Sequence, residues 1–198
     1  DFVFMDSIAT DDSIREKYAG KTVIATAARL YKWKGIENTI EAIRSLPEDM
    51  KSKIIFLIIG DGEDFDRLKK LSQGLPIEMT GKLERKKVIG ILKASDIYIH
   101  SSLPGGGLST SLLEAMYCEC SVIATPNEGA DEIVEHDKNG TLIGTPSAKK
   151  VGTAIEKLAQ DRTKREILST TAKRNVRERF SWNASIEKYL ELFQTIRK

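Results

Sequence analysis

Short, almost wholly apolar runs alternate with segments of helical periodicity up to Ile143, and this alternation constrains the fold more than any other feature. Apolar runs without a polar alternation are typical of strands that are buried on both faces of a sheet. Strand–helix–strand units with short connections require parallel pairing and right-handed crossovers. We therefore predict an α/β fold with a doubly wound parallel sheet of about six strands and extra C-terminal helices.

The sequence assigns a residue range to each element. The predicted strands are Thr22–Thr26, Lys53–Ile59, Ile77–Thr80, Ile97–His100, Ser121–Thr125 and Gly140–Ile143. The predicted helices between them are Ile36–Leu46, Phe65–Gln73, Glu84–Ala94, Ser109–Cys118 and Ala130–Glu135. Beyond Ile143 the pattern is only helical and predicts Ala148–Gln160, Thr163–Phe180 and Asn183–Arg197, with Ser181 before the last helix and Trp182 packed inward.

Composition excludes several classes of function. The 198 residues include 31 basic and 29 acidic side chains, so a net charge of +2 gives no case for binding nucleic acid through bulk charge. The longest apolar run, Ile54–Ile59, is too short to cross a membrane. Cys118 and Cys120 lie too close together to staple a fold and lack further metal ligands nearby, so we expect reduced thiols and no metal site.

The loops that follow the predicted strands carry most of the glycines and polar residues of interest. These loops span residues 27–35, 60–63, 81–83, 101–109 and 126–130. Ligands of open parallel sheets collect at the carboxyl ends of the strands. We therefore expect one binding site at one edge of the sheet.

The glycine-rich turn between Ile97–His100 and the helix Ser109–Cys118 has the features of a phosphate site. Such a turn points unpaired N–H groups and the positive end of a helix dipole at a bound anion. Its glycines permit close backbone approach, and a glutamate one turn into the helix can accept hydrogen bonds from two adjacent hydroxyls. The candidate binding residues here are Gly106, Gly107, Leu108, Ser109, Thr110 and Glu114.

The loop after the first strand contributes two cations, Arg29 and Lys34. An arginine fork and a mobile lysine charge together suit a diphosphate. A solvated basic loop is the alternative for these residues taken alone. Trp33 between them is either a packing aromatic or a stacking surface.

Two shorter loops add main-chain groups to the same edge. Gly60-Asp61-Gly62 lacks the third glycine of a dinucleotide fingerprint, so it indicates either a tight turn or close backbone approach to a ligand. The candidates Gly81, Lys82 and Leu83 follow a short strand, where main-chain groups can recognise the edge of a nucleobase. His100 ends a strand at this edge and is interpreted as a hydrogen-bonded structural histidine.

Taken together and in this order, the motifs resemble those of the group 1, or family 4, retaining glycosyltransferases. The motifs are Ala28-Arg29-Leu30 with Lys34-Gly35, Ile59-Gly60-Asp61-Gly62, Gly81-Lys82-Leu83, Ala94-Ser95-Asp96-Ile97, Gly107-Leu108-Ser109 with Leu113-Glu114-Ala115-Met116, and Asn139-Gly140. The resemblance covers residues 20–195. It implies a Rossmann-like domain, one of the two that make up a GT-B fold, and this chain resembles the carboxyl-terminal, donor-binding half.

The resemblance also implies roles for these residues. Arg29 and Lys34 would be catalytic, since they would hold the donor diphosphate and stabilise the departing nucleotide. Glu114 would bind the ribose hydroxyls, Gly81–Leu83 the base, and Gly107–Thr110 the distal phosphate and sugar. The implied reaction transfers a glycosyl group from a UDP- or GDP-sugar to an acceptor hydroxyl with retention, without a metal or a permanently bound cofactor.

The residues and the resemblance together give expectations for domains, partners and location. Residues 1–20 are expected to be a linker or domain-boundary remnant, and residues 21–180 the nucleotide-sugar-binding domain. Residues 181–198 are expected to form a helix that packs towards an N-terminal, acceptor-binding domain absent from this chain, which begins at Asp1 without a methionine. The expected acceptor is a glycan or a lipid-linked glycan. We expect a cytoplasmic location, with peripheral contact at the inner membrane face through the absent domain left open.

Two positions depart from the family pattern. Gly106 stands where the family usually carries a second glutamate, which contacts the transferred sugar, and Asn127-Glu128-Gly129 stands where the family favours paired glycines. Three other functions therefore stay open: a nucleotide-sugar epimerase, a nucleotide-sugar-binding module without catalysis, and a dehydrogenase-type domain. The missing fingerprint glycine argues against the last.

Overall fold

A single parallel sheet forms the centre of the molecule in the computed structural model, which describes residues 2–105, 108–144 and 147–196. The strand order is β3-β2-β1-β4-β5-β6, and every neighbouring pair is parallel. The strands are β1 (Thr22–Ala27), β2 (Ile54–Ile59), β3 (Ile77–Gly81), β4 (Ile97–His100), β5 (Ser121–Ala124) and β6 (Thr141–Leu142). The predicted doubly wound α/β fold is confirmed, with strand bounds within two residues of the expected ones.

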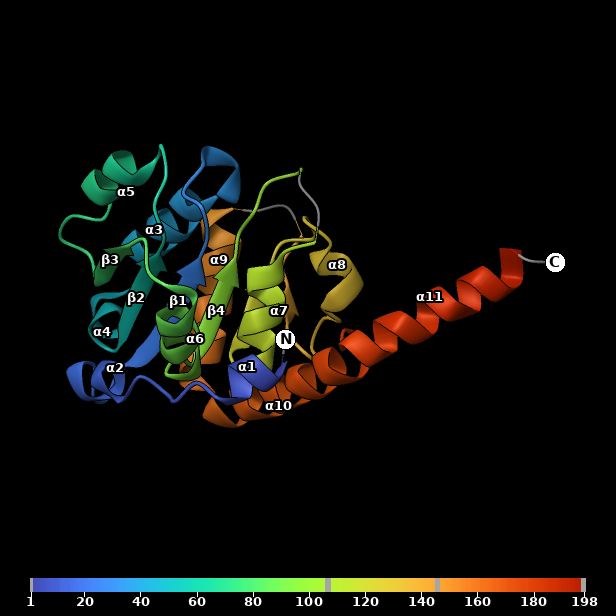
Figure 1. Ribbon diagram of the computed structural model, residues 1–198. Helices are drawn as coiled ribbons and strands as arrows, with labels where there is room; N and C mark the ends of the chain where they lie inside the picture. Colours follow the sequence, from blue (N-terminus) through green and yellow to red (C-terminus); the bar gives the residue numbers. More distant parts are fainter. Residues whose placement is uncertain (1, 106–107, 145–146, 197–198) are drawn as a thin grey trace.

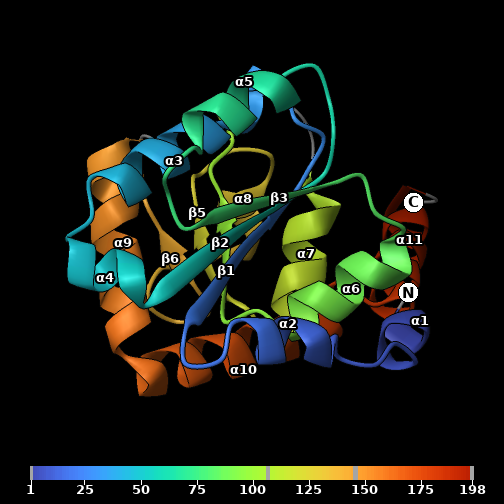
Figure 2. The same cartoon turned by 90° about the vertical axis from the view of Figure 1, so that its left-hand side faces the viewer.

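Helices cover both faces of this sheet (Figure 2). One face carries α3 (Ile36–Arg44), α4 (Glu48–Ser52), α5 (Phe65–Leu71) and α9 (Ala148–Gln160). The other carries α6 (Arg85–Lys93), α7 (Thr110–Tyr117), α8 (Ala130–Ile133) and most of the buried side of α10 (Arg162–Arg179). Because strand side chains alternate between faces, Val23 and Ala25 enter one core and Ile24 enters the other. All six residues of β2 are buried, as the continuous apolar run predicts.

The strand order reverses at β1, and this reversal positions the site. Strand β1 pairs with β2 on one side and with β4 on the other. The chain leaves β1 and β2 towards one face and leaves β4 towards the other, so their following loops diverge and open a crevice at the carboxyl edge. The loop that carries Arg29 and Lys34 and the glycine-rich loop after β4 both flank this crevice.

The first residues, expected to be a linker or domain-boundary remnant, contain two short helices. They form α1 (Phe2–Asp6) and α2 (Asp12–Lys17), and Met5 is buried in the core at 2% exposure. Phe2 stacks on Tyr117 of α7 with ring centroids 4.3 Å apart. The elements were missed because helices of five or six residues carry too few turns to show a periodic pattern. The same reason applies to α4 and to the 3₁₀ turn η1 (Lys32–Lys34).

The last helix, α11 (Trp182–Ile196), continues from α10 and extends away from the body of the domain (Figure 1). Ser181 caps it, since its Oγ accepts a hydrogen bond from the Ala184 N–H at 3.1 Å. The expectation that Trp182 packs inward is wrong, because 74% of this residue is exposed. Helix α11 buries none of its described side chains, so its large apolar residues lie on an open surface.

Across the residues that the structure describes, we find no helix with both the length and the apolar character needed to span a bilayer.

Candidate functional site

A cavity of about 490 Å³ opens at the carboxyl ends of β1, β2 and β3. Five of the predicted site residues line it: Arg29, Gly60, Gly62, Lys82 and Leu83. The remaining lining includes Tyr31, Asp61 and Val88. Three loops that are far apart in the sequence therefore meet in one place, as the expectation of a single site at this edge requires.

The two glycines of Gly60-Asp61-Gly62 are required by the close approach of this loop to the loop after β1. Gly60 has φ +138°, and a Cβ there would lie 1.9 Å from the Ala28 carbonyl oxygen. A Cβ at Gly62 would lie 2.6 Å from the carbonyl oxygen of Leu30. The Leu30 N–H also donates to the Asp61 carbonyl at 2.9 Å. The lack of a side chain at Gly60 and Gly62 thus allows these two loops of the cavity to pack against each other. Of the two interpretations, a tight turn describes these glycines.

Gly81 lies beside the cavity rather than in its lining. It ends β3 with φ +71°, and its carbonyl accepts a hydrogen bond from the Gly60 N–H at 2.9 Å. Lys82 and Leu83 follow it into the cavity wall. Gly81 therefore fixes the position at which Lys82 and Leu83 leave strand β3.

Arg29 is exposed at the rim, where its Nη1 donates to the Tyr31 hydroxyl at 3.3 Å. Among the residues that the structure describes, no carboxylate lies within ion-pair distance of Arg29. A guanidinium without an anionic partner at the mouth of a cavity can form a bidentate contact with a phosphate. This arrangement suits the role that the sequence suggested for Arg29.

Lys34, the second predicted cation, lies in a neighbouring cleft and not in the 490 Å³ cavity. The cleft is lined by residues of β1, β4 and the start of the next loop, including His100, Ser101 and Ser102. The Lys34 ammonium forms an ion pair with Glu128 at 2.7 Å and lies over the Trp33 ring, 4.1 Å from its centroid. The two cations of this loop thus differ, because Lys34 has an anionic partner and is largely buried.

Glu128 is the residue of this edge that sequence reasoning missed. Its side chain is 5% exposed, and its backbone adopts a positive φ of 53°, which L residues other than Asn and Asp rarely do. Both carboxylate oxygens accept from the Lys34 ammonium, at 2.7 and 2.9 Å, and Oε2 also accepts from the Ser102 hydroxyl. The available signal was the departure from paired glycines at Asn127-Glu128-Gly129.

His100 is buried beside this pair. Its Nε2 lies 3.4 Å from Glu128 Oε2, yet it makes no hydrogen bond within the described part of the chain. Burial lowers the pKa of His100, although the Glu128 carboxylate opposes this shift. The imidazole is therefore neutral near pH 7 and does not act as a second cation towards Glu128.

The N-terminus of α7 differs in part from the predicted phosphate site. Ser109 is buried, and its N–H donates to the Glu128 carbonyl at 3.1 Å, so this group is not free for a ligand. Leu108 and Thr110 are exposed. Gly106 and Gly107 lie outside the described residues, so their predicted roles stay predictions.

Glu114, the predicted ribose ligand, faces the side of α7 that packs on α6. Its Oε1 accepts from Arg85 Nη2 at 2.7 Å, and its side chain is 19% exposed. The Arg85 guanidinium lies over the Phe4 ring, 4.9 Å from the centroid. The pair was not anticipated, because nothing in the sequence indicates that α6 brings a cation to this point.

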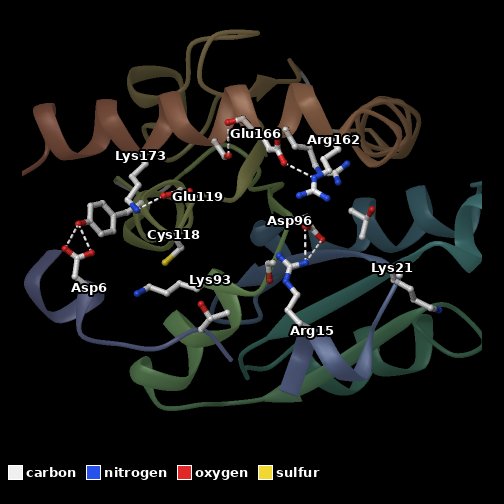
Figure 3. A pocket seen from close by; sticks show the side chains of 17 residues that line it. Asp6, Arg15, Lys21, Lys93, Asp96, Cys118, Glu119, Arg162, Glu166 and Lys173 are labelled. Carbon is white, nitrogen blue, oxygen red and sulfur yellow. Dashed lines mark hydrogen bonds and ion pairs between the residues drawn. The ribbon is translucent and has the colours of Figure 1, made fainter. Parts of the chain in front are cut away.

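A second cavity, of about 710 Å³, lies at the opposite edge of the sheet, where β1 and β4 begin (Figure 3). Three of its cations pair with carboxylates: Arg15 with Asp96 at 3.0 Å, Arg162 with Glu166 at 2.8 Å, and Lys173 with Glu119 at 2.5 Å. None of the predicted site residues lines it. Because the residues predicted for the site gather at the carboxyl edge instead, the cavity there is the better candidate site.

In the described part of the chain, no group of three His, Cys, Asp or Glu residues is arranged to hold a metal ion. Cys118 and Cys120 are buried free thiols. Burial raises the pKa of Cys118 to about 12, which keeps the thiol protonated and unreactive.

Comparison with known proteins gives the chain a family. The sequence profile described as Glycosyl transferases group 1 matches residues 7–175. An uncharacterized glycosyltransferase of Methanocaldococcus jannaschii, MJ1069, is 45% identical over 195 residues, which are 97% of this chain and 50% of that protein. A lipopolysaccharide core biosynthesis glycosyltransferase of Rhizobium meliloti, LpsE, is 26% identical over 93% of this chain and 53% of its own length. The chain thus spans about half the length of these curated relatives.

Solved structures share the fold. HepE of Anabaena, crystallised with UDP-glucose, superposes with a TM-score of 0.82 at 23% identity, over 96% of this chain and 55% of HepE. The C-terminal domain of the group 1 glycosyltransferase LpcC from Francisella tularensis gives a TM-score of 0.77 at 24% identity, over 90% of this chain and 98% of that domain. At these identities the structures show a common fold, while the profile match and the 45% identical relative carry the assignment. The chain belongs to the group 1 glycosyltransferase family.

Proposed function

We propose that this chain is the donor-binding half of a glycosyltransferase, which transfers a sugar from a nucleoside-diphosphate sugar to an acceptor hydroxyl with retention. The observation that carries the proposal is the meeting of Arg29, the Gly60–Gly62 turn and Lys82-Leu83 around one cavity at the carboxyl edge. The cavity lies beside the point where the strand order reverses, which is where nucleotides bind in folds of this class. The solved HepE complex with UDP-glucose supports a nucleotide-sugar as ligand, and UDP is the first ligand to test.

The chemistry that this arrangement supports is electrostatic. Cleavage of the bond between the sugar and the diphosphate leaves negative charge on the departing phosphate. Arg29 at the cavity rim and Lys34 in the adjacent cleft are the cations that would offset this charge. Residues of the Lys82-Leu83 loop would contact the base, and Glu114 would accept from the ribose hydroxyls once it releases or shares Arg85.

The second half of the enzyme would supply the acceptor site. The relatives are about twice as long as this chain, and α11 presents large apolar side chains on an open surface. These observations support the proposal that α11 packs towards an N-terminal, acceptor-binding domain. Relatives such as the lipopolysaccharide core biosynthesis glycosyltransferase LpsE support a glycan or lipid-linked glycan as acceptor. The chain alone would bind the donor and transfer nothing.

Calorimetric titration of the chain with UDP, GDP and ADP tests the donor site. Arg29→Ala should weaken binding of the preferred nucleotide by about 1.5–3 kcal/mol, the usual contribution of a hydrogen bond to a charged group. Arg162→Ala is the matched control, because Arg162 is 83% exposed at the opposite edge of the sheet. Equal affinities for the two variants, or no binding of any nucleotide by the wild type, would contradict the proposal.

A full-length protein with the N-terminal domain then separates the alternatives. Transfer of labelled sugar to a glycan acceptor supports the transferase. Isomerisation of the sugar would instead identify an epimerase, and nucleotide binding without either reaction would identify a binding module.

A further inference from the structure

The loop after β5 holds Glu128 in a conformation that favours glycine. Glu128 has φ +53° and the following Gly129 has φ +70°. Three hydrogen bonds fix this loop: Asn127 Nδ2 donates to the Ser102 carbonyl at 2.7 Å, Thr125 Oγ1 donates to the same carbonyl at 2.6 Å, and the Ser109 N–H donates to the Glu128 carbonyl at 3.1 Å. These hydrogen bonds hold the backbone on both sides of Glu128 and so stabilise its strained conformation.

The carboxylate of Glu128 points inward onto Lys34. The two groups meet at 2.7 and 2.9 Å, with 5% of the Glu128 side chain and 15% of the Lys34 side chain exposed. Lys34 is the only lysine or arginine within ion-pair distance of this carboxylate among the residues that the structure describes. Because Glu128 is almost fully buried, it has little surface to offer a ligand and acts through its partner.

The surroundings of the pair leave it sensitive to a second anion. His100 is neutral, and its Nε2 lies 3.4 Å from Glu128 Oε2 without a hydrogen bond. Ser102 contributes only a hydroxyl donor. A phosphate that approaches Lys34 therefore meets a cation whose charge is already offset, and it meets the negative field of the carboxylate in a poorly solvated cleft.

We propose that Glu128 is a positioning residue that sets the affinity of the donor site for diphosphate, because it holds Lys34 in place and offsets its charge while the site is empty. The inference rests on the proposed function, in which the donor diphosphate binds near Lys34. A bound diphosphate has to share Lys34 with Glu128 or take it over. The carboxylate thereby weakens product binding and favours release of the nucleoside diphosphate.

The Glu128→Gln variant removes the negative charge of the side chain and keeps its hydrogen-bonding geometry. Glutamine keeps an oxygen that accepts from Lys34 and an amide that can donate to the Ser102 oxygen, so Lys34 stays held while one negative charge disappears. Removing a like charge at this range should tighten binding of UDP by at least about tenfold. The dependence of UDP affinity on salt should also become steeper, because Lys34 is no longer compensated.

The experiment titrates the chain with UDP at two salt concentrations for the wild type, Glu128→Gln and Glu132→Gln. Glu132 is exposed four residues away on α8, so its variant removes the same charge outside the cleft and should leave the affinity unchanged. Glu128→Gly is the second variant. It suits the positive φ at this position and so guards against a failure to fold. It should also tighten UDP binding, but by less than Glu128→Gln, because glycine no longer holds Lys34 in place.

The outcomes distinguish this inference from the proposed function. If the wild type does not bind UDP, GDP or ADP, the proposed function fails, and the inference fails with it. If the wild type binds UDP but Glu128→Gln or Glu128→Gly binds it equally or more weakly, the inference alone is overturned. Tighter binding with a steeper salt dependence in both variants supports it.

Discussion

Replacing Gly35 by alanine tests whether the loop after β1 is held against the loop after β4 by backbone contact. Gly35 lies between η1 and α3 with φ +64°, and a Cβ there would lie 2.1 Å from the Ser101 carbonyl oxygen. The Ser101 hydroxyl also donates to the Lys34 carbonyl at 3.0 Å. The loop that carries Lys34 therefore approaches Ser101, the residue after β4, so closely that only a hydrogen fits between them.

Two costs add in the Gly35→Ala variant. Placing alanine in the left-handed region costs about 1–2 kcal/mol. Ordinary contact begins near 3.4 Å, so the backbone of one loop has to move by at least 3.4 − 2.1 = 1.3 Å. Overpacking of this kind costs about 1–3 kcal/mol, and the total is about 2–5 kcal/mol.

Gly74→Ala isolates the first cost. Gly74 has φ +75°, but nothing lies within 4 Å of the Cβ that alanine would add. Both substitutions reduce the entropy of the unfolded chain equally, so the difference between the variants measures the contact with Ser101.

Urea denaturation of the wild type and both variants gives the free energies of unfolding. Gly35→Ala should lose about 1–3 kcal/mol more stability than Gly74→Ala. It should also bind UDP more weakly, because Lys34 moves with the loop. Equal losses of stability in the two variants would refute the argument that contact with Ser101 positions Lys34.

Two further predictions concern buried polar groups near the carboxyl edge. Tyr98→Phe removes a buried hydroxyl that donates to the Ala27 carbonyl at 3.1 Å and lies 2.9 Å from Ser111 Oγ. It should destabilise the protein by about 1–3 kcal/mol in urea denaturation, and an unchanged midpoint would show that these contacts contribute nothing. Asp64 is 5% exposed and accepts from Arg67 at 2.6 and 2.8 Å, which lowers its pKa below the ordinary 3.8. The contribution of the Asp64 carboxylate to stability is therefore complete above pH 3.8 and is lost as pH falls through the lowered pKa. The difference in unfolding free energy between wild type and Asp64→Asn should stay constant from about pH 7 to 5 and shrink below about pH 4. A difference that grows on acidification would contradict this assignment.

The sheet was predictable because each of its strands carries a signal within its own few residues. Ile54–Ile59 is apolar at every position, and such a run is stable only where both faces are covered. Parallel pairing and the edge at which the loops gather then follow from connection lengths alone. Arg29 and the Gly60–Gly62 turn reached the predicted cavity for this reason.

The parts that could not be predicted depend on contacts between distant segments. Helix α1 is too short to show periodicity, and it is held by Met5 in the core and by Phe2 on Tyr117. Arg85 reaches Glu114 only because α6 packs beside α7. Trp182 is of a residue type that usually lies in a core, but it is exposed because its helix extends beyond the domain. The direction of that helix depends on the whole fold.

The sequence by itself determined the class of fold, the edge at which the candidate site lies and the family of the chain, because these depend on periodicity and on short motifs read in order. The tertiary structure alone decided that Lys34 and Arg29 differ in their surroundings. Lys34 is paired with Glu128, 94 residues further along the chain, while Arg29 stays exposed. Whether a charge is offset depends on the groups within a few ångströms of it, and it is the folding of β1, β4 and β5 side by side that brings those groups together.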